Sequence, residues 1–136
     1  MALAAHYATA ALNAKANAQA ALLNAGFLDL YDGTQPPSAN SAVTTQTRLV
    51  RLAFSNPAFS AASAGSVTSI AITPALADAA GTASWFRAVQ ADGTAVVDGS
   101  VGMTGNGTFN LELNTTTVTV GVSVSVNSLT LSESAG

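Results

Sequence analysis

The chain contains no cysteine, so it can form neither a disulfide nor a thiolate metal site. Charge is also scarce: Asp, Glu, Lys and Arg make up 8% of the 136 residues, against about a quarter in an average globular domain. Serine, threonine, asparagine and glycine must therefore cover much of the surface. This composition is typical of proteins that lie against neighbours, among them coat, fibre and adhesin modules.

Positive charge is especially rare, and the formal net charge is -3. The basic residues are Lys15, Arg48, Arg51 and Arg87. Scattered cations cannot neutralise a run of phosphates or form a polybasic membrane patch, so we expect neither a nucleic-acid nor a membrane partner. No apolar run approaches the roughly 20 residues of a membrane helix. The opening residues also lack the basic start of a signal peptide, which predicts a soluble protein made in a cytoplasm.

An alanine-rich opening predicts a helix over residues 2–25, because alanine is the best helix former and no proline or glycine precedes Gly26. We expect Gly26 to be the left-handed residue just past the helix end. One stripe of this helix follows the 3.6-residue period. Its members are Leu3, Tyr7, Ala11, Ala14, Ala18 and Leu22. Their mostly small side chains would let another backbone approach closely.

After Gly26 the apolar period changes to two, which predicts short strands separated by turns. Residues 34–42, which contain Pro36-Pro37, are expected to be a loop, since proline cannot donate to a sheet ladder. Near the end the alternation changes parity at Asn127-Ser128, which predicts a bulge or a strand that changes sheets. The sequence therefore predicts an all-β, jelly-roll-like antiparallel β-sandwich (residues 27–136) behind an N-terminal α-helix (residues 1–26).

The Asp92-Gly93 pair predicts a hairpin with a two-residue type I′ turn. The register that follows pairs Val89 with Val96, Ala88 with Val97, Arg87 with Asp98, and Phe86 with Gly99. Gly99 would leave room for the Phe86 ring. Trp85, Arg87 and Asp98 would lie on the opposite, wetter face.

Candidate catalytic, cofactor and metal residues are missing from the pattern. His6 is the only histidine and has no acidic partner at ligand spacing. No nucleophile elbow is present, and the glycine-rich GMTGNG segment lacks the lysine of a phosphate loop. The Trp and Tyr residues (Trp85, Tyr7 and Tyr31) lie on separate elements, which favours packing over a sugar platform. We expect a protein that is not an enzyme and holds no cofactor or metal.

A series of short segments follows a distinctive order along nearly the whole chain. They are the alanine-rich opening that ends at Asn24-Ala25-Gly26, Leu30-Tyr31-Asp32-Gly33-Thr34-Gln35-Pro36, residues 52–59, residues 81–87, Asp92-Gly93-Thr94, residues 98–102, Asn114-Thr115-Thr116 and residues 124–131. In this combination the chain resembles the capsid cement, or head decoration, proteins of tailed phages.

The resemblance implies a virion protein made in the host bacterial cytoplasm and placed on the outer surface of the capsid. Its partner would be the major capsid protein, and copies would form a dimer or trimer at a symmetry axis. Each copy would cement neighbouring capsid subunits and so stabilise the shell. The family supplies no catalytic residue or cofactor.

The expected contact residues lie in the helix and in the proline loop. They are Leu3, Tyr7, Leu22, Pro36 and Pro37. An alternative is that the helix only covers one face of its own sheet. A rival function is a receptor- or glycan-binding β-sandwich module of a phage fibre, tail or adhesin.

Overall fold

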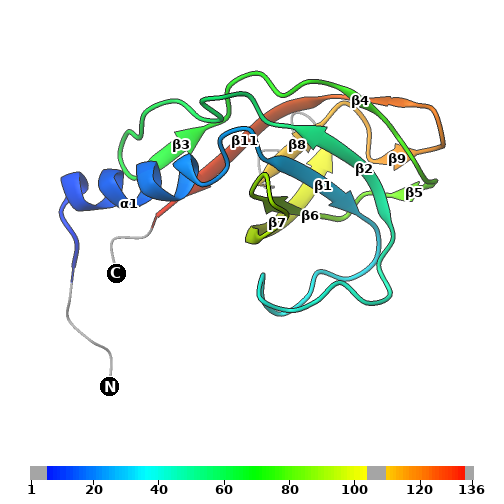
Figure 1. Cartoon of the computed structure of the whole chain (residues 1–136), viewed down its shortest axis with the longest axis horizontal. Helices are drawn as coiled ribbons and strands as arrows, with labels where there is room; N and C mark the ends of the chain where they lie inside the picture. Colours follow the sequence, from blue (N-terminus) through cyan, green and yellow to red (C-terminus); the bar gives the residue numbers. More distant parts are fainter. Residues whose placement is uncertain (1–5, 104–109, 134–136) are drawn as a thin grey trace.

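A computed structural model describes residues 6–103 and 110–133, which form a mostly β protein with one N-terminal helix (Figure 1). A seven-stranded sheet has the order β2-β1-β6-β7-β8-β11-β3. Its strands are β1 (Phe27–Tyr31), β2 (Arg48–Ala53), β3 (Ser66–Thr68), β6 (Trp85–Val89), β7 (Ala95–Met103), β8 (Leu111–Leu113) and β11 (Val126–Ser132). Neighbouring strands are antiparallel except for the parallel pair β7–β8.

Two short ladders accompany the large sheet. One pairs β4 (Ala75–Leu76) with β10 (Ser123–Val124), and the other pairs β5 (Gly81–Thr82) with β9 (Thr117–Val118). The expected combination of a mostly antiparallel β structure with an N-terminal helix is therefore confirmed. No helix in the described part of the chain is both long and apolar enough to cross a membrane.

The hydrophobic core draws on both ends of the large sheet. Leu28 and Phe86 come from one end and Leu111 and Leu129 from the other, and all four belong to the same buried cluster. A sheet that buries residues from both ends in one cluster curves around its own core, which is consistent with a β-sandwich. Leu23, just after the helix, joins the same cluster.

The helix α1 runs over Thr9–Ala21 and is shorter than the prediction at both ends. Residues 2–5 lie outside the described part, residues 6–8 are not helical, and residues 22–25 form turns. Ala25, with φ of 57°, takes the left-handed conformation that the sequence had assigned to Gly26. Gly26 is needed for a different reason, since a Cβ there would collide with the Val89 carbonyl oxygen.

The buried face of α1 is opposite to the predicted stripe. Leu12, Ala16 and Ala20, spaced four residues apart, are buried, whereas Tyr7 and Leu22 are exposed. The prediction chose the wrong face for packing because alanine occurs all around this helix. Apolar periodicity then distinguishes the two faces poorly.

Asparagine side chains fasten α1 to the irregular segment before β3. The amide oxygens of Asn13, Asn17 and Asn24 accept hydrogen bonds from the backbone N–H groups of Gly65 (2.8 Å), Ala62 (2.9 Å) and Ala58 (2.9 Å). From Asn13 to Asn24 the residue numbers increase, while those of their partners decrease from Gly65 to Ala58, so the two segments run antiparallel. One face of α1 is thus held against its own domain, beside β3 (Figure 1).

The β6–β7 hairpin confirms most of the predicted register. Arg87 lies opposite Asp98, and Phe86 opposite Gly99. Val89, however, pairs with Ala95 and not with Val96, because the register shifts between Ala88 and Val89.

The turn itself accounts for that shift. Gly93 is left-handed with φ of 92°, and the Asp92 carboxylate accepts a hydrogen bond from Thr94 N–H (2.9 Å). Together with the Gln90–Thr94 backbone bond (2.8 Å), this is the longer loop in which a type I turn precedes a left-handed glycine. The predicted two-residue turn is therefore wrong. The predicted irregularity near Asn127 is confirmed by a register shift between Val126 and Ser128.

Replacing Gly99 by alanine tests the hairpin packing. A Cβ at Gly99 would lie 2.5 Å from Cε1 of the fully buried Phe86 ring. We expect Gly99→Ala to lower the free energy of unfolding by about 1–3 kcal/mol in a denaturant titration, as overpacking does elsewhere. A stability equal to that of the wild type would show that the ring has room to move.

Replacing Asn24 by alanine tests the attachment of α1. The change leaves the Ala58 N–H without its acceptor, so we expect a loss of about 1–3 kcal/mol in the free energy of unfolding. Asn127→Ala is the matched control, because Asn127 is exposed. Equal stabilities of the two variants would contradict the role given to the asparagines.

Candidate functional site

A long connection between β1 and β2, residues 32–47, has no helix or strand and is called the strap here. Its two ends meet: Thr47 N–H donates to the Asp32 carboxylate (2.6 Å), and Asp32 N–H donates to the Thr47 carbonyl (3.2 Å). Loops of this length with joined ends are Ω-loops, which are often functional. In Figure 1 the strap is the cyan loop that leaves β1 and returns to β2.

Side chains from the β6 region hold the strap in place. Ser84 Oγ donates to the Gly33 carbonyl (2.6 Å), Trp85 Nε1 to the Asp32 carbonyl (2.9 Å) and Arg87 Nη2 to the Ser38 carbonyl (3.4 Å). Trp85 and Arg87 are only 1% and 7% exposed. The wetter face predicted for these two residues is therefore wrong, because the strap covers it.

A row of alternating charges crosses four strands beneath the strap. Arg51 on β2 binds Asp29 on β1 through both of its carboxylate oxygens (2.7 and 2.8 Å). Arg87 on β6 binds Asp98 on β7 in the same way (2.7 and 2.9 Å). Asp29 and Arg87 are themselves cross-strand partners, so the four residues form one charge row.

Hydrogen bonds pair the charges of the row, and both of its carboxylates are buried. Asp29 is 2% exposed, and the Asp98 side chain is 4% exposed. The hydrogen bond from Arg87 to Asp98 raises the pKa of Arg87 further above its already high value, and the bond to Asp29 does the same for Arg51. Both oxygens of each carboxylate accept a hydrogen bond from an arginine, and such paired groups are suited to fixing structure.

An aromatic pair lies next to the charge row. The rings of Tyr31 and Trp85 stack with centroids 4.5 Å apart and an interplanar angle of 13°. Sequence reasoning had kept these two aromatics apart, but β1 and β6 make them direct cross-strand partners. Burial, followed by the negative charge of Asp29, raises the pKa of Tyr31. Trp85 is buried and Tyr31 is only half-buried, so the pair offers no open platform of two rings.

The predicted contact residues divide between two surfaces, and Leu3 lies outside the described residues. Tyr7 is 46% exposed and Leu22 49% exposed, at opposite ends of α1. Pro36 is half-buried and Pro37 exposed, both on the strap. The exposed side of α1, with the residues that flank the helix, is called the outer face of α1 here: it comprises Ala14 and Ala18 of the helix together with Tyr7 before it and Leu22 after it.

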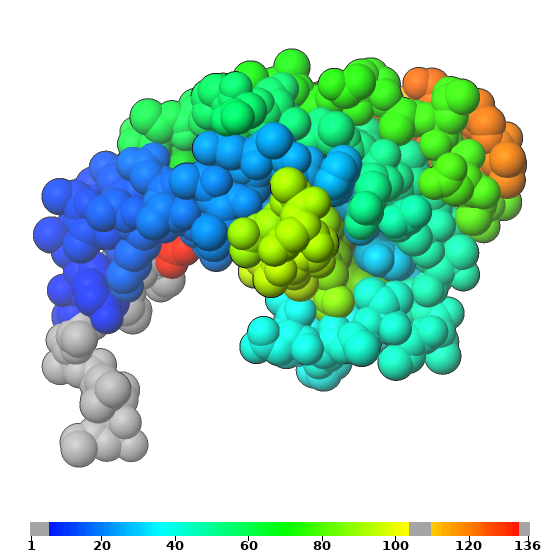
Figure 2. Space-filling model, viewed as in Figure 1, coloured from blue at the N-terminus to red at the C-terminus, as the bar shows by residue number. Residues whose placement is uncertain are grey.

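The two surfaces are well separated in the molecule. In the space-filling view the strap (cyan) and α1 (blue) lie on either side of the β6–β7 hairpin (yellow-green) (Figure 2). On α1 the ammonium group of Lys15 lies 3.4 Å from the Tyr7 ring centroid, which orients that ring. The predicted contact residues therefore lie on two surfaces: Tyr7, beside Lys15, belongs to the helix surface, and Pro36 and Pro37 belong to the strap. The structure does not bring these two surfaces together.

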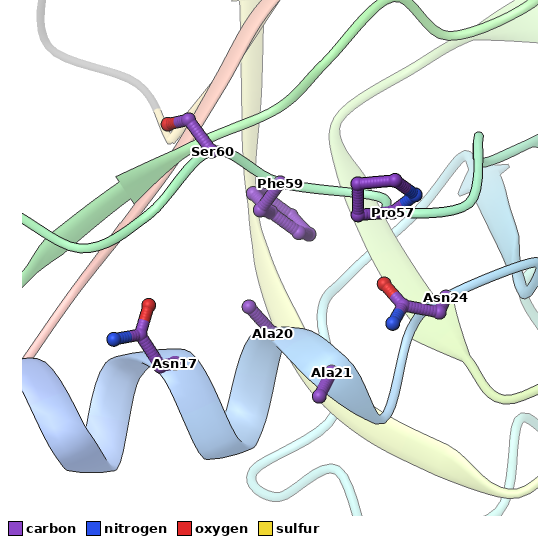
Figure 3. A pocket seen from close by; sticks show the side chains of 7 residues that line it. All are labelled: Asn17, Ala20, Ala21, Asn24, Pro57, Phe59 and Ser60. Carbon is purple, nitrogen blue, oxygen red and sulfur yellow. The ribbon is translucent and has the colours of Figure 1, made fainter.

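A small cavity lies in the seam between α1 and the segment before β3 (Figure 3). It measures about 140 Å³. Its lining residues are Asn17, Ala20, Ala21, Asn24, Pro57, Phe59 and Ser60. Sites for small organic ligands are larger, at about 300–1,000 Å³. Because the Asn17 and Asn24 oxygens already bind the backbone across the seam, the cavity is a by-product of helix packing.

Residues 6–103 and 110–133 contain no candidate metal centre. That part of the chain holds no group of three or more His, Cys, Asp or Glu side chains able to bind a metal. His6 is exposed and precedes the helix.

Sequence reasoning missed the residues that shape the two surfaces. For the strap this is Ser84, for the charge row beside it the Asp29–Arg51 pair, and for α1 the asparagines. Asn13 and Asn17 were the available pattern, since residues four apart share a face of a helix, whereas Asn24 lies in the turn after α1.

Comparison with known proteins finds no family model, no curated protein and no solved structure that matches this chain.

Removing one member of the charge row should be costly. We expect Arg87→Met to lower the free energy of unfolding by about 3–5 kcal/mol, because it leaves the Asp98 carboxylate buried without a partner. The double variant Arg87→Met/Asp98→Leu should recover much of this loss. A double variant as unstable as the single one would show that the strap contact, and not charge pairing, is responsible.

Proposed function

We propose that this chain is a structural protein of the virion that binds the outer surface of a phage head and cements neighbouring major capsid protein subunits. In this proposal the protein catalyses no reaction, needs no cofactor and has neither a nucleic acid nor a membrane as a partner. We also propose that the sandwich has a jelly-roll-like arrangement. The mostly antiparallel pairing of its strands supports this.

The observation that carries the proposal is the presence of two separate exposed surfaces on one domain. A cement protein must touch at least two subunits of the shell at once. The outer face of α1 and the strap lie on either side of the β6–β7 hairpin, so each can contact a different neighbour (Figure 2). An Ω-loop and a helix fastened by asparagines hold these surfaces at a fixed distance.

The chemistry of the surfaces supports the same function. Tyr7 and Leu22 give the outer face of α1 two exposed apolar side chains, one at each end. Arg51 and Arg87, half of the basic residues, are already paired within the charge row. The centres of protein–protein interfaces are usually depleted of charged residues.

Cementing would follow from many modest contacts. A dimer or trimer at a symmetry axis presents several copies of both surfaces, so each further contact becomes intramolecular once the first has formed. The shell as a whole is then stabilised against the pressure of packaged DNA, although each single contact is weak.

A second candidate function is a receptor- or glycan-binding module of a fibre, tail or adhesin. The stacked Tyr31–Trp85 pair favours it, since sugars bind to aromatic rings. The strap covers Trp85, so only Tyr31 is available for such a contact. Binding of the purified protein on a glycan array that is lost in Tyr31→Ala would replace the cement proposal by this one.

Occupancy on purified heads tests the α1 surface. Heads assembled without this protein would be mixed with the variant Tyr7→Asp/Leu22→Asp and sedimented. We expect bound protein to fall at least roughly tenfold, because the variant places two charges in a contact that excludes water. Val120→Asp is the matched control, since Val120 is 68% exposed in the turn between β9 and β10. Undiminished binding by the α1 variant would remove α1 from the contact.

A further inference from the structure

The strap presents an unusual surface for an ordered loop: residues 33–47 contain no charged side chain. Hydroxyl and amide groups dominate it, and ten of these fifteen residues are exposed. Those residues are Gly33, Thr34, Gln35, Pro37, Ser38, Asn40, Ala42, Thr44, Thr45 and Thr47. A partner that fits this surface is itself uncharged and offers hydrogen-bond donors and acceptors.

Internal hydrogen bonds give the strap a defined shape. Ser38 organises its middle, where its hydroxyl accepts from Asn40 N–H (3.0 Å) and its carbonyl accepts from Ser41 N–H (3.0 Å). Gln46 closes the second half, because its side-chain oxygen accepts from Thr44 N–H (3.1 Å) and its amide donates to the Thr34 carbonyl (2.5 Å). A loop with this many internal bonds is ordered before any partner arrives.

Hydrogen bonds from the sheet under the strap link the strap to β6. The bonds from Ser84, Trp85 and Arg87 reach carbonyls at the start and the middle of the strap. Arg87 is in turn fixed by Asp98 through two short bonds, so its position is set by the charge row. Ordering a residue costs about 1–2 kcal/mol of conformational entropy, and a preordered surface avoids that cost when it binds.

We propose that the strap is a preformed contact surface for an uncharged, hydrogen-bonding protein surface, and that Ser84, Trp85 and Arg87 are the positioning residues that set its shape. This inference rests on the proposed function, in which that surface belongs to the major capsid protein. It adds the chemistry of the partner and the source of the strap's order.

Hydrogen exchange on the isolated protein tests the positioning residues without any head. Arg87→Lys keeps the charge opposite Asp98 but loses the forked guanidinium that reaches Ser38. We expect the Asn40 and Ser41 amides to exchange roughly tenfold faster in this variant, the effect of losing one hydrogen bond. The Asn114 amide, which bonds the Ser125 carbonyl (3.2 Å) on another element, should be unchanged.

Ser84→Ala is the second variant, because it removes one strap contact without touching a buried charge. It should speed exchange in the strap and leave Asn114 unchanged. If both variants fold and their strap amides exchange at the wild-type rate, the positioning role of Ser84 and Arg87 is overturned.

Binding to purified heads tests the contact surface. Thr45→Glu places a charge on the exposed side of the strap, and Thr119→Glu is the matched control on the exposed β9–β10 turn. We expect Thr45→Glu alone to weaken binding at least roughly tenfold, because the partner surface has no cation to pair with the new charge. Wild-type affinity should also change less than about twofold between roughly 0.05 and 0.5 M salt, since strap residues 33–47 carry no charge to be screened and the Asp32 carboxylate is bonded to Thr47 within the strap.

The outcomes separate this inference from the proposed function. Heads that bind wild type and Thr45→Glu equally well would overturn the strap surface while leaving cementing intact. A strong salt dependence would overturn the uncharged partner. Heads that do not bind the wild-type protein at all would overturn the proposed function together with the assignment of the partner, while hydrogen exchange would still decide the positioning residues.

Discussion

The charge row is the interaction on which the rest of the structure depends. Arg51, Asp29, Arg87 and Asp98 alternate in sign across β2, β1, β6 and β7, and each neighbouring pair is a direct cross-strand pair. A slip of one residue in any of these strands would leave a buried ion without its partner, which costs several kcal/mol. The charge row therefore fixes the register of these four strands, and this register turns Leu28 and Phe86 into the core.

The strap and the outer face of α1 are both attached to the sheet, but by different interactions. The strap lies over the charge row and takes three hydrogen bonds from the β6 region, so its position follows from the register. The helix is attached at the β3 side through neutral asparagine amides and small buried residues. Two attachments of different chemistry thus hold the two exposed surfaces on one sheet.

The features that could be predicted from the sequence are the local ones. The Arg87–Asp98 pair and the Phe86–Gly99 contact follow from residues close together around one turn, and the irregularity near Asn127 follows from a change in alternation. The Asp29–Arg51 bond spans 22 residues and the Trp85–Asp32 bond spans 53, and no local pattern indicates which distant strands pair. For the candidate site, Tyr7, Leu22 and Pro37 are exposed, and their role as contacts stays a prediction. The packing face of α1 could not be chosen, because alanine lies on both of its sides.

The central claim is that the two surfaces of one copy bridge neighbouring subunits of a phage head. Electron cryomicroscopy of heads assembled with and without this protein tests it most directly. The account predicts ordered extra density on the outer shell, into which the domain fits with the outer face of α1 on one capsid subunit and the strap on its neighbour. Identical shells with and without the protein, or a domain that touches a single subunit, would contradict it.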